Sequence, residues 1–317
     1  MKRIGLLTRD CSGVNAAIRA VVRTAYQYDI EVYGFMHGYN GLMDNDWQRL
    51  DRRSVAGIIH LGGTILKTAR SQRFKTPEGQ QAALKTLKDN EIDGLIVIGG
   101  NGSLTGAYTL SSKYDFPVIG VPATIDNDIN GVEYTIGAHT AVNVALDALD
   151  KIRDTAISME RIFIVEVMGR DCGYIASRVA LAGGCEELIV PERDYNIDDI
   201  CARIKAGHAS GKVTWIIIVS EGKAHAADIL HLIQDKTGFE TRQVVLGHIQ
   251  RGGSPLAFDR ILAARLGNFA VELLKKGEAG KCVCLNTGQL GFFDLKEVTK
   301  PKDIEVDTYF DLIKILT

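Results

Sequence analysis

Short runs of apolar and often β-branched residues alternate along the chain with longer segments in which apolar residues recur at helical spacing. Most of the short runs are apolar on both faces, which is typical of parallel strands covered by helices. The alternation predicts a doubly wound α/β architecture with mostly parallel sheets. We expect strands at 3–8, 31–36, 94–100, 116–124, 162–169, 187–191, 213–222 and 242–248. Helical spacing is clear at 14–28, 79–90, 139–156 and 197–208.

Composition narrows the class of protein. The chain has 317 residues, of which 46% are hydrophobic and 24% are charged, and its net charge is −2. This balance allows a large α/β unit or two domains, and it gives no field that would attract nucleic acid or acidic membranes. The longest apolar run, at 215–219, is too short to span a bilayer, and the N-terminus reads as a strand rather than a signal peptide. Six scattered cysteines predict free thiols in a cytoplasmic protein.

Glycines or acidic residues follow four of the predicted strands. In such sheets ligands bind beyond the carboxyl ends of the strands, so we expect the active cleft there. The stretch "VIGGNGS" (97–103) has the glycines and small polar residues that bring a backbone close to phosphate, but its longest side chain is the amide of Asn101. No GxxxxGK[ST] pattern occurs, which argues against a Walker-type ATPase.

The residues alone leave their roles open. The segment 122–128, "PATIDND", combines a threonine hydroxyl with two carboxylates, and it could be a turn with a helix cap or a site of acid–base chemistry. His248 and Arg251 precede a Gly-Gly turn and suit phosphate and sugar hydroxyls, whereas a lone His is more often structural. Arg161 and Arg170 flank one strand, where arginines are usually solvated or ion-paired.

Taken together, the motifs are specific. The segments "VIGGNGS", "PATIDNDINGVEYTIG", "DKIRDTA", "EVMGRDCGYIA", "SEG" and "GFETRQVVLGHIQRGGSPLAFDR" occur in this order. In that order and spacing they resemble bacterial ATP-dependent 6-phosphofructokinase from residue 1 to about 290, and only the last 25 or so residues are uninformative. The resemblance implies two α/β/α lobes. The larger, nucleotide-binding lobe would hold residues 1–137 and 250–300, and the smaller, sugar-phosphate-binding lobe 138–249 and 301–317.

The resemblance also assigns roles around the sugar. Asp126 matches the general base that takes the proton of the sugar 1-hydroxyl, Thr124 and Asp128 match residues that handle the transferring phosphoryl group and Mg²⁺, and Arg170 lies near the reacting centre. Arg161 and Arg242 match a pair that crosses from a neighbouring subunit, so the family's site requires an oligomer. The positions matching fructose 6-phosphate contacts are Arg161, Met168, Gly169, Glu221, Arg242, His248 and Arg251.

The nucleotide half departs from the family pattern. The family's "TSGGDxPGxN" loop reads "TRDCSGVN" (8–15) here, which is two residues shorter and lacks the Gly-Gly pair, with Arg9 in the approach. Asn101 replaces an aspartate that helps to hold Mg²⁺, and since an amide is a weaker ligand, Mg·ATP should bind or react less well. Gly102 and Ala123 favour ATP, because pyrophosphate-dependent relatives carry Asp and Lys there. The positions on the nucleotide side are Asp10, Tyr39, Arg70, Ser71, Asn101, Gly102 and Ser103.

An effector site between subunits, which binds ADP or phosphoenolpyruvate in the family, is partly matched. Its basic run is interrupted at 211–214, "GKVT". The matching positions are Arg19, Arg23, Arg52, Arg153, Glu186 and Lys212.

Three functions are compatible with these patterns. The first is a kinase that converts Mg·ATP and fructose 6-phosphate into ADP and fructose 1,6-bisphosphate. The second is a catalytically deficient paralogue that binds fructose 6-phosphate and serves as a regulatory or assembly subunit. The third is another phosphoryl donor or sugar on the same scaffold, which Gly102 and the retained arginines disfavour. We expect a homotetramer or a hetero-oligomer with an active phosphofructokinase.

Overall fold

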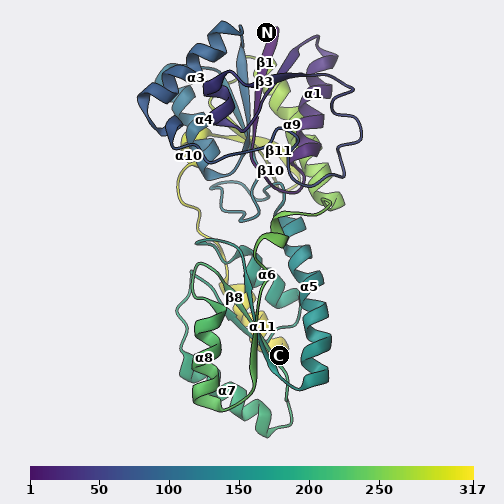
Figure 1. Ribbon diagram of the computed structural model, residues 1–317, viewed down its shortest axis with the longest axis vertical. Coiled ribbons are helices and arrows are strands. Elements are labelled where there is room, and N and C mark those ends of the chain that lie inside the picture. The colour runs from purple at the N-terminus through teal and green to yellow at the C-terminus, as the bar shows by residue number, and fades with distance from the viewer. The chain divides into compact units, whose positions relative to one another are not determined.

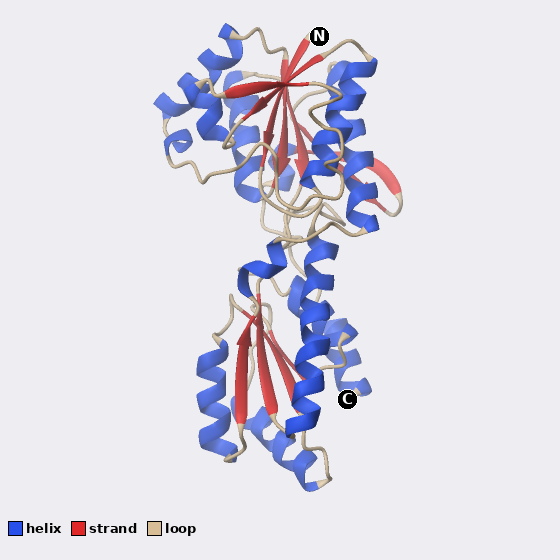
Figure 2. Ribbon diagram, turned by 45° about the vertical axis from the view of Figure 1, so that its right-hand side comes forward, coloured by secondary structure: helices blue, strands red, loops and turns tan.

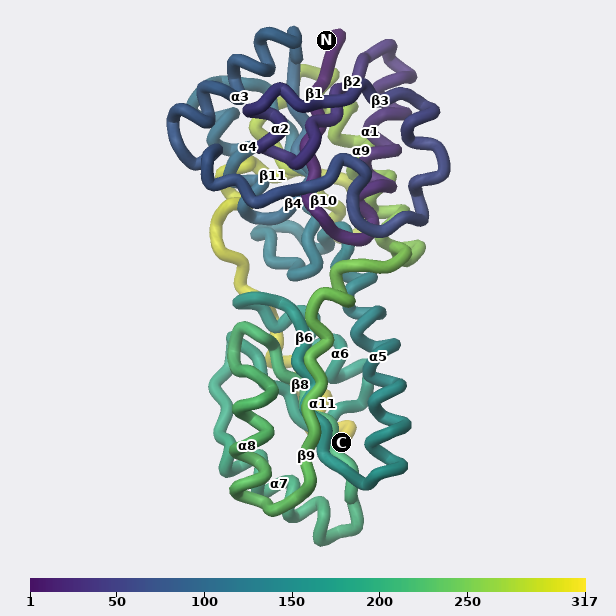
Figure 3. The backbone as a smooth tube through the Cα atoms, in the orientation of Figure 1, coloured from purple at the N-terminus to yellow at the C-terminus, as the bar shows by residue number.

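The computed structural model describes all residues from 1 to 317, and they form two compact units (Figure 1). Unit 1 comprises Met1–Thr140 and Arg251–Lys302, and unit 2 comprises Ala141–Gln250 and Asp303–Thr317. The chain therefore passes from one unit to the other three times, which can be followed along the tube in Figure 3. The sequence placed these boundaries after residues 137, 249 and 300, and the structure places them after 140, 250 and 302.

Unit 1 contains a seven-stranded sheet. Five strands are parallel, and the two edge strands, β3 and β11, run antiparallel to their neighbours. In their order across the sheet, the strands are β11 (Gln289–Asp294), β10 (Lys281–Asn286), β5 (Val118–Pro122), β4 (Gly94–Gly99), β1 (Arg3–Thr8), β2 (Glu31–Phe35) and β3 (Trp47–Leu50).

Helices cover both faces of this sheet (Figure 2). They are α1 (Val14–Gln27), α2 (Tyr39–Asp44), the short 3-10 helix η1 (Arg73–Lys75), α3 (Pro77–Asp89), α4 (Asn101–Tyr114), α9 (Ala257–Lys275) and α10 (Leu295–Val298). Helix α1 buries Val14, Ala17, Ile18, Val21, Val22 and Ala25, which is the periodicity that its sequence predicts. It packs so closely on α9 that a Cβ at Gly267 would lie 2.9 Å from the Ala17 carbonyl oxygen.

Unit 2 contains a four-stranded, fully parallel sheet flanked by helices. Across the sheet the strands are β7 (Glu187–Ile189), β8 (Trp215–Ser220), β6 (Ile162–Val167) and β9 (Thr241–Val245). The helices are α5 (Ala138–Met159), whose first three residues belong to unit 1, α6 (Tyr174–Ala182), α7 (Ile197–Ala209), α8 (Ala226–Thr237), the 3-10 helix η2 (Gly247–Arg251) and α11 (Asp307–Leu316).

The predicted α/β architecture with mostly parallel sheets is confirmed. All eight expected strands are present, and most are shorter than the apolar runs that predicted them. Every residue of the central strands β4, β6 and β8 is buried, which explains why their apolar runs were recognisable. The strands β3, β10 and β11 were not expected. β3 and β11 are half-exposed edges that lack a continuous apolar run, whereas β10 is mostly buried but has only a four-residue apolar run. None of the helices combines the length and the apolar composition that a bilayer crossing demands.

Candidate active site

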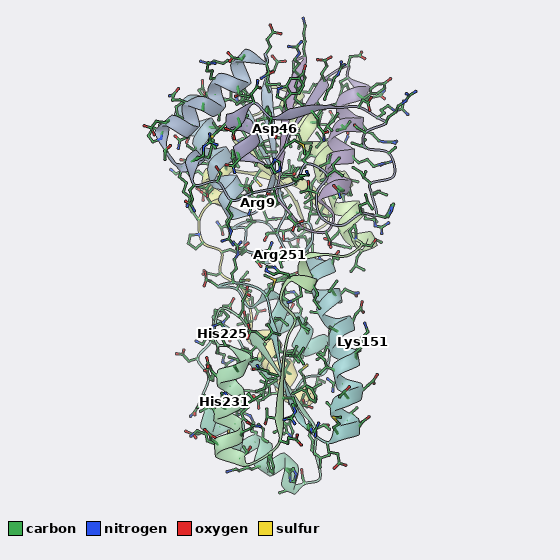
Figure 4. All side chains as sticks on the ribbon, in the orientation of Figure 1. Arg9, Asp46, Lys151, His225, His231 and Arg251 are labelled. Carbon is green, nitrogen blue, oxygen red and sulfur yellow. The ribbon has the colours of Figure 1, made fainter.

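Three of the four glycine-rich or acidic strand ends belong to unit 1, where β5, β4 and β1 are neighbours. Backbone hydrogen bonds join them just beyond the sheet, from Arg9 N to Ile98 O (3.0 Å) and from Ala123 N to Gly99 O (3.0 Å). Figure 4 labels Arg9 among the loops at this end of unit 1. The loops 8–15, 100–103 and 123–135 therefore meet at one edge of the sheet, as expected for a ligand site in an open α/β sheet.

The N-terminus of α4 faces this edge. The Gly100 carbonyl accepts the N–H groups of Ser103 (2.9 Å) and Leu104 (3.0 Å), so Asn101 and Gly102 supply the outermost backbone donors of a 14-residue helix. A Cβ placed on Gly102 would meet no atom within 4 Å, so the space in front of this turn is open. Backbone donors and the positive end of a helix dipole suit a phosphate group.

Asn101 contacts the carboxylate expected to hold the metal. Its Nδ2 donates to Oδ2 of Asp128 at 2.7 Å and to the Asp128 carbonyl oxygen at 3.3 Å. The amide therefore supplies a charge-assisted hydrogen bond to the Asp128 carboxylate. Sequence reasoning considered Asn101 only as a weakened metal ligand and missed this contact.

The donor set suits Mg²⁺ held largely by substrate phosphates. No group of three or more His, Cys, Asp or Glu side chains is arranged to enclose a metal ion by itself. Asp128, with Asp126 two residues earlier, offers carboxylate oxygens, and Mg²⁺ usually binds to one or two carboxylates together with phosphates and water. The residues present are thus compatible with the ion.

The loop that carries Thr124, Asp126 and Asp128 is rigidly held. Asp126 is only 1% exposed, and its Oδ2 lies 3.4 Å from Oγ1 of Thr124. Asn127, between the two acids, has a positive φ of 50° and is 3% exposed. Its Oδ1 accepts hydrogen bonds from N (2.8 Å) and Oγ1 (3.0 Å) of Thr135, and its Nδ2 donates to the Glu133 carbonyl (3.0 Å). An amide side chain thus fixes a backbone conformation that non-glycine residues seldom adopt.

The loop 8–15 is tied to several other segments of unit 1. Nη1 of Arg9 donates to the carbonyl of Ala69 (2.8 Å) and to Oγ1 of Thr68 (3.2 Å), next to the expected nucleotide contacts at 70 and 71. Oγ of Ser12 lies 3.0 Å from each of the carbonyl oxygens at 252 and 253, and Oδ1 of Asp10 would lie 3.4 Å from a Cβ on Gly63. The loop is therefore packed in place rather than left open.

Tyr39, Ser71 and Ser103 are brought together by packing. The Tyr39 hydroxyl donates to the Ser103 carbonyl (2.8 Å), and its ring stacks on Phe74 with 4.0 Å between centroids. Burial raises the pKa of Tyr39, so its hydroxyl remains a neutral donor. Oγ of Ser71 accepts the Phe74 N–H (3.3 Å), and Arg70 is exposed to solvent. Through these contacts α2, η1 and α4 pack together next to the N-terminal turn of α4.

Unit 2 gathers a second set of expected residues where β6 and β8 end. Met168, Gly169 and Arg170 follow β6, and Glu221 follows β8. Oε1 of Glu221 accepts the N–H groups of Arg170 (3.1 Å) and Gly169 (3.4 Å). Arg170 has a positive φ of 52°, and a Cβ at Gly222 would lie 1.7 Å from its carbonyl oxygen. Glycine is therefore required at 222 for the turn that presents Arg170.

Arg161 and Arg242 lie at the opposite end of the unit 2 sheet. Arg161 directly precedes β6 and Arg242 lies near the start of β9, so neither belongs with the cluster at residues 168–170. Glu240 pairs with both, through Nε of Arg161 at 2.8 Å and through a close contact with Nη2 of Arg242. The remaining expected contacts, His248 and Arg251, lie in η2, where the chain leaves unit 2, and His248 is exposed.

The six expected effector residues fall into two sets. Arg19 and Arg23 line a cavity of about 310 Å³ between α1 and α9, together with Tyr28 and Glu272. Cζ of Arg52, in the same unit, lies 5.2 Å from the centre of the Tyr26 ring.

The other three are in unit 2. Arg153 donates to the Gly184 carbonyl (3.0 Å), and Lys212 pairs with Glu186 (3.0 Å). The other Glu186 oxygen accepts the Ile216 N–H at 2.7 Å. These three side chains are therefore engaged within their own unit.

Comparisons with known proteins identify the family of the chain. A family model described as Phosphofructokinase matches residues 3–274. The ATP-dependent 6-phosphofructokinase of Bacillus subtilis (strain 168) is 50% identical over 319 residues, which cover 100% of both chains. That of Bacillus pumilus (strain SAFR-032) is 52% identical over 95% of each.

Solved structures share the fold. A phosphofructokinase from Saccharomyces cerevisiae has a TM-score of 0.87 at 32% identity, covering 94% of this chain but only 45% of the yeast chain. A pyrophosphate-dependent phosphofructokinase from Marinobacter aquaeolei, at 21% identity, has a TM-score of 0.85 and covers 100% of this chain and 91% of its own, which shows the fold alone. This chain therefore belongs to the phosphofructokinase family.

Proposed function

We propose that this protein is an ATP-dependent 6-phosphofructokinase, which transfers the terminal phosphoryl group of ATP to the 1-hydroxyl of fructose 6-phosphate. The observation that carries the proposal is the meeting, within unit 1, of the open N-terminus of α4 with the loop of Asp126 and Asp128. A phosphate anchor beside buried and partly buried carboxylates is the arrangement that phosphoryl transfer to an alcohol needs. Relatives at about 50% identity that carry this name support it.

In this proposal the chain acts chiefly by positioning. Asp126 accepts the proton of the sugar hydroxyl, and Thr124 orients the transferring group. The N–H groups at the start of α4 bind nucleotide phosphates, assisted by the other expected positions on this side, which are Asp10, Tyr39, Arg70, Ser71 and Ser103. Asp128 would hold Mg²⁺, which when bound supplies positive charge that offsets the charge of the phosphates. Unit 1 is thereby the nucleotide-binding unit.

Unit 2 would supply most of the sugar-phosphate contacts. Glu221, His248 and the turn 168–170 would bind the sugar phosphate, with Arg170 as the expected catalytic arginine. Arg251, where the chain re-enters unit 1, is the remaining expected sugar-phosphate contact. Arg161 and Arg242, at the far end of the sheet, would serve a neighbouring subunit and bind its 6-phosphate in place of Glu240. A homotetramer in the cytoplasm is the assembly that we propose. The two sets of expected effector residues would bind an anionic ligand at an interface between subunits.

One observation favours the second candidate, a catalytically deficient paralogue that binds fructose 6-phosphate. Nδ2 of Asn101 donates a hydrogen bond to Asp128, so this position offers no second carboxylate to a metal ion. Arg9 lies in the shortened loop 8–15, beside the proposed phosphate site. By analogy with the removal of one oxyanion-hole donor, loss of a preorganised contact to the phosphates should lower the rate by about 10²-fold or more.

A steady-state assay separates the two functions. Purified protein with Mg·ATP and fructose 6-phosphate should form fructose 1,6-bisphosphate far faster than the Asp126→Ala variant, which lacks only the proposed base. Turnover no greater than that of the variant, with fructose 6-phosphate binding intact in calorimetry, would reject the kinase in favour of the regulatory subunit.

A further inference from the structure

The loop of Thr124, Asp126 and Asp128 is held by a residue far away in the sequence. Lys302 lies in the irregular segment between α10 and α11, and it is the last residue of unit 1 along the chain. Its Nζ donates to the carbonyl of Asn127 at 2.8 Å and to that of Val132 at 2.7 Å. The two carbonyls are five positions apart in the sequence, so a single ammonium group links both sides of the loop.

The first of these carbonyls is at the strained position. Asn127 has its positive φ of 50° directly between the two acids, and its peptide group leads into Asp128. A residue held in a sparsely populated conformation keeps it only where its surroundings impose it. The Asn127 side chain is fixed by Thr135 and Glu133, and Lys302 fixes the carbonyl of the same residue. The direction in which the backbone enters Asp128 is therefore set by Lys302 as well.

The charge of Lys302 also suits this place. The loop carries Asp126, Asp128 and Glu133, and a cation among them offsets part of their mutual repulsion. A hydrogen bond from the Thr287 N–H, one with Tyr134 and the charge of Lys302 together lower the pKa of Glu133. The contacts of Lys302 are only partly exposed to solvent, which limits screening.

We propose that Lys302 is a positioning residue for phosphoryl transfer, which keeps the loop 124–135 in the conformation that presents Asp126 and Asp128. It acts through the backbone of Asn127 and Val132 and does not touch the substrates. The inference rests on the proposed function, since it takes Asp126 to be the general base. It gives a role in the reaction to the C-terminal segment, whose sequence was uninformative.

The test compares three variants. Lys302→Met keeps much of the side chain's length and apolar surface but removes the donors, whereas Lys302→Arg keeps a charge and several donors. Lys300→Met is the matched control, because Nζ of Lys300 contacts only the exposed Glu297 (2.6 Å) of its own segment. We expect Lys302→Met to lower kcat by about 10- to 100-fold with KM values changed far less, since small misplacements of reacting groups act on the transition state. Lys302→Arg should recover much of the rate, and Lys300→Met should behave as wild type.

A second readout does not depend on turnover. Amide hydrogen exchange should be faster across residues 127–135 in Lys302→Met than in wild type, while exchange in the unit 2 strands stays unchanged. If wild type itself shows no turnover, the kinase proposal fails, but the exchange measurement still decides whether Lys302 holds the loop. Unchanged exchange would overturn the inference. So would a kcat of Lys302→Met within twofold of wild type, or a loss that only follows the folded fraction in thermal unfolding.

Discussion

At the scale of single residues, Asn101 sets how much negative charge lies beside the Asp128 carboxylate. The amide donates to Asp128 at 2.7 Å, so the carboxylate is stabilised by a neutral neighbour. A carboxylate at 101 would bring two negative groups to the same separation, and these repel each other unless a cation lies between them. The residue at this position therefore decides how strongly the loop depends on a metal ion.

We expect Asn101→Asp to make the stability of the protein depend on Mg²⁺. Without the ion, the repulsion should lower the free energy of unfolding by about 1–2 kcal/mol, and added Mg²⁺ should raise the melting temperature more than in wild type. Thermal unfolding with and without Mg²⁺ measures both effects.

The control is Asn143→Asp, in which Nδ2 of the native amide also contacts a carboxylate, Asp147 (3.3 Å), but on an exposed surface. The expectation fails if both variants respond to Mg²⁺ alike.

At the scale of elements, the start of α5 depends on a carboxylate from another helix. Asp259, in the first turn of α9, is fully buried. Its Oδ1 accepts the Gly137 N–H (2.9 Å), and its Oδ2 accepts the N–H (2.8 Å) and hydroxyl (2.5 Å) of Thr140. The two N–H groups belong to the residue just before α5 and to its first turn, where no intrahelical acceptor is available, so α9 caps α5.

Asp259→Ala should destabilise the protein substantially. Three buried donors lose their acceptor, and we expect the free energy of unfolding to fall by about 2–4 kcal/mol in denaturant titrations. Asp228→Ala is the matched control, because Asp228 also lies in the first turn of a helix, α8, but is exposed. Its effect should stay within about 0.5 kcal/mol. Equal effects from the two substitutions would show that the buried contacts contribute nothing special.

These elements also show what the sequence could predict. Buried parallel strands are recognisable because their apolar runs are continuous, and the residues at their carboxyl ends could therefore be proposed as site residues from the sequence alone. The roles of Asp259 and Lys302 could not be proposed, because partners of these residues are 119 and 175 residues away. Most of these partners are backbone groups, which leave no mark in a side-chain pattern. Asn127 was inside a recognised motif, but its function is to hold a backbone angle, which its residue type alone does not reveal.

At the scale of the whole molecule, both units keep their thiols out of water. All six cysteines are free and buried, with Cys11, Cys282 and Cys284 in unit 1 and Cys172, Cys185 and Cys201 in unit 2. Burial raises the pKa of Cys185 to about 12, and it also raises the pKa values of Cys11 and Cys282. The folded protein therefore keeps these protons at a pH where the unfolded chain releases them.

Stability should fall as the pH rises above about 9. Because the pKa values are raised in the folded state, the unfolded chain binds fewer protons there, and each thiol removes up to about 1.4 kcal/mol of unfolding free energy per pH unit. Urea titrations in reducing buffer between pH 8 and pH 10 measure this slope. Cys282→Ala, although less stable, should show a smaller slope than wild type. A free energy of unfolding that does not change with pH across this range would contradict the raised pKa values of the buried thiols.

The threefold passage of the chain between units has a consequence for synthesis on the ribosome. The sheet of unit 1 needs β10, which pairs with β5, and β10 begins only at Lys281. The sheet of unit 2 is complete at Val245, before β10 has been made. Domains tend to fold as units while they emerge. The central part of the chain can therefore form its sheet first, while the strands at the N-terminus, although translated earliest, wait for their last partner.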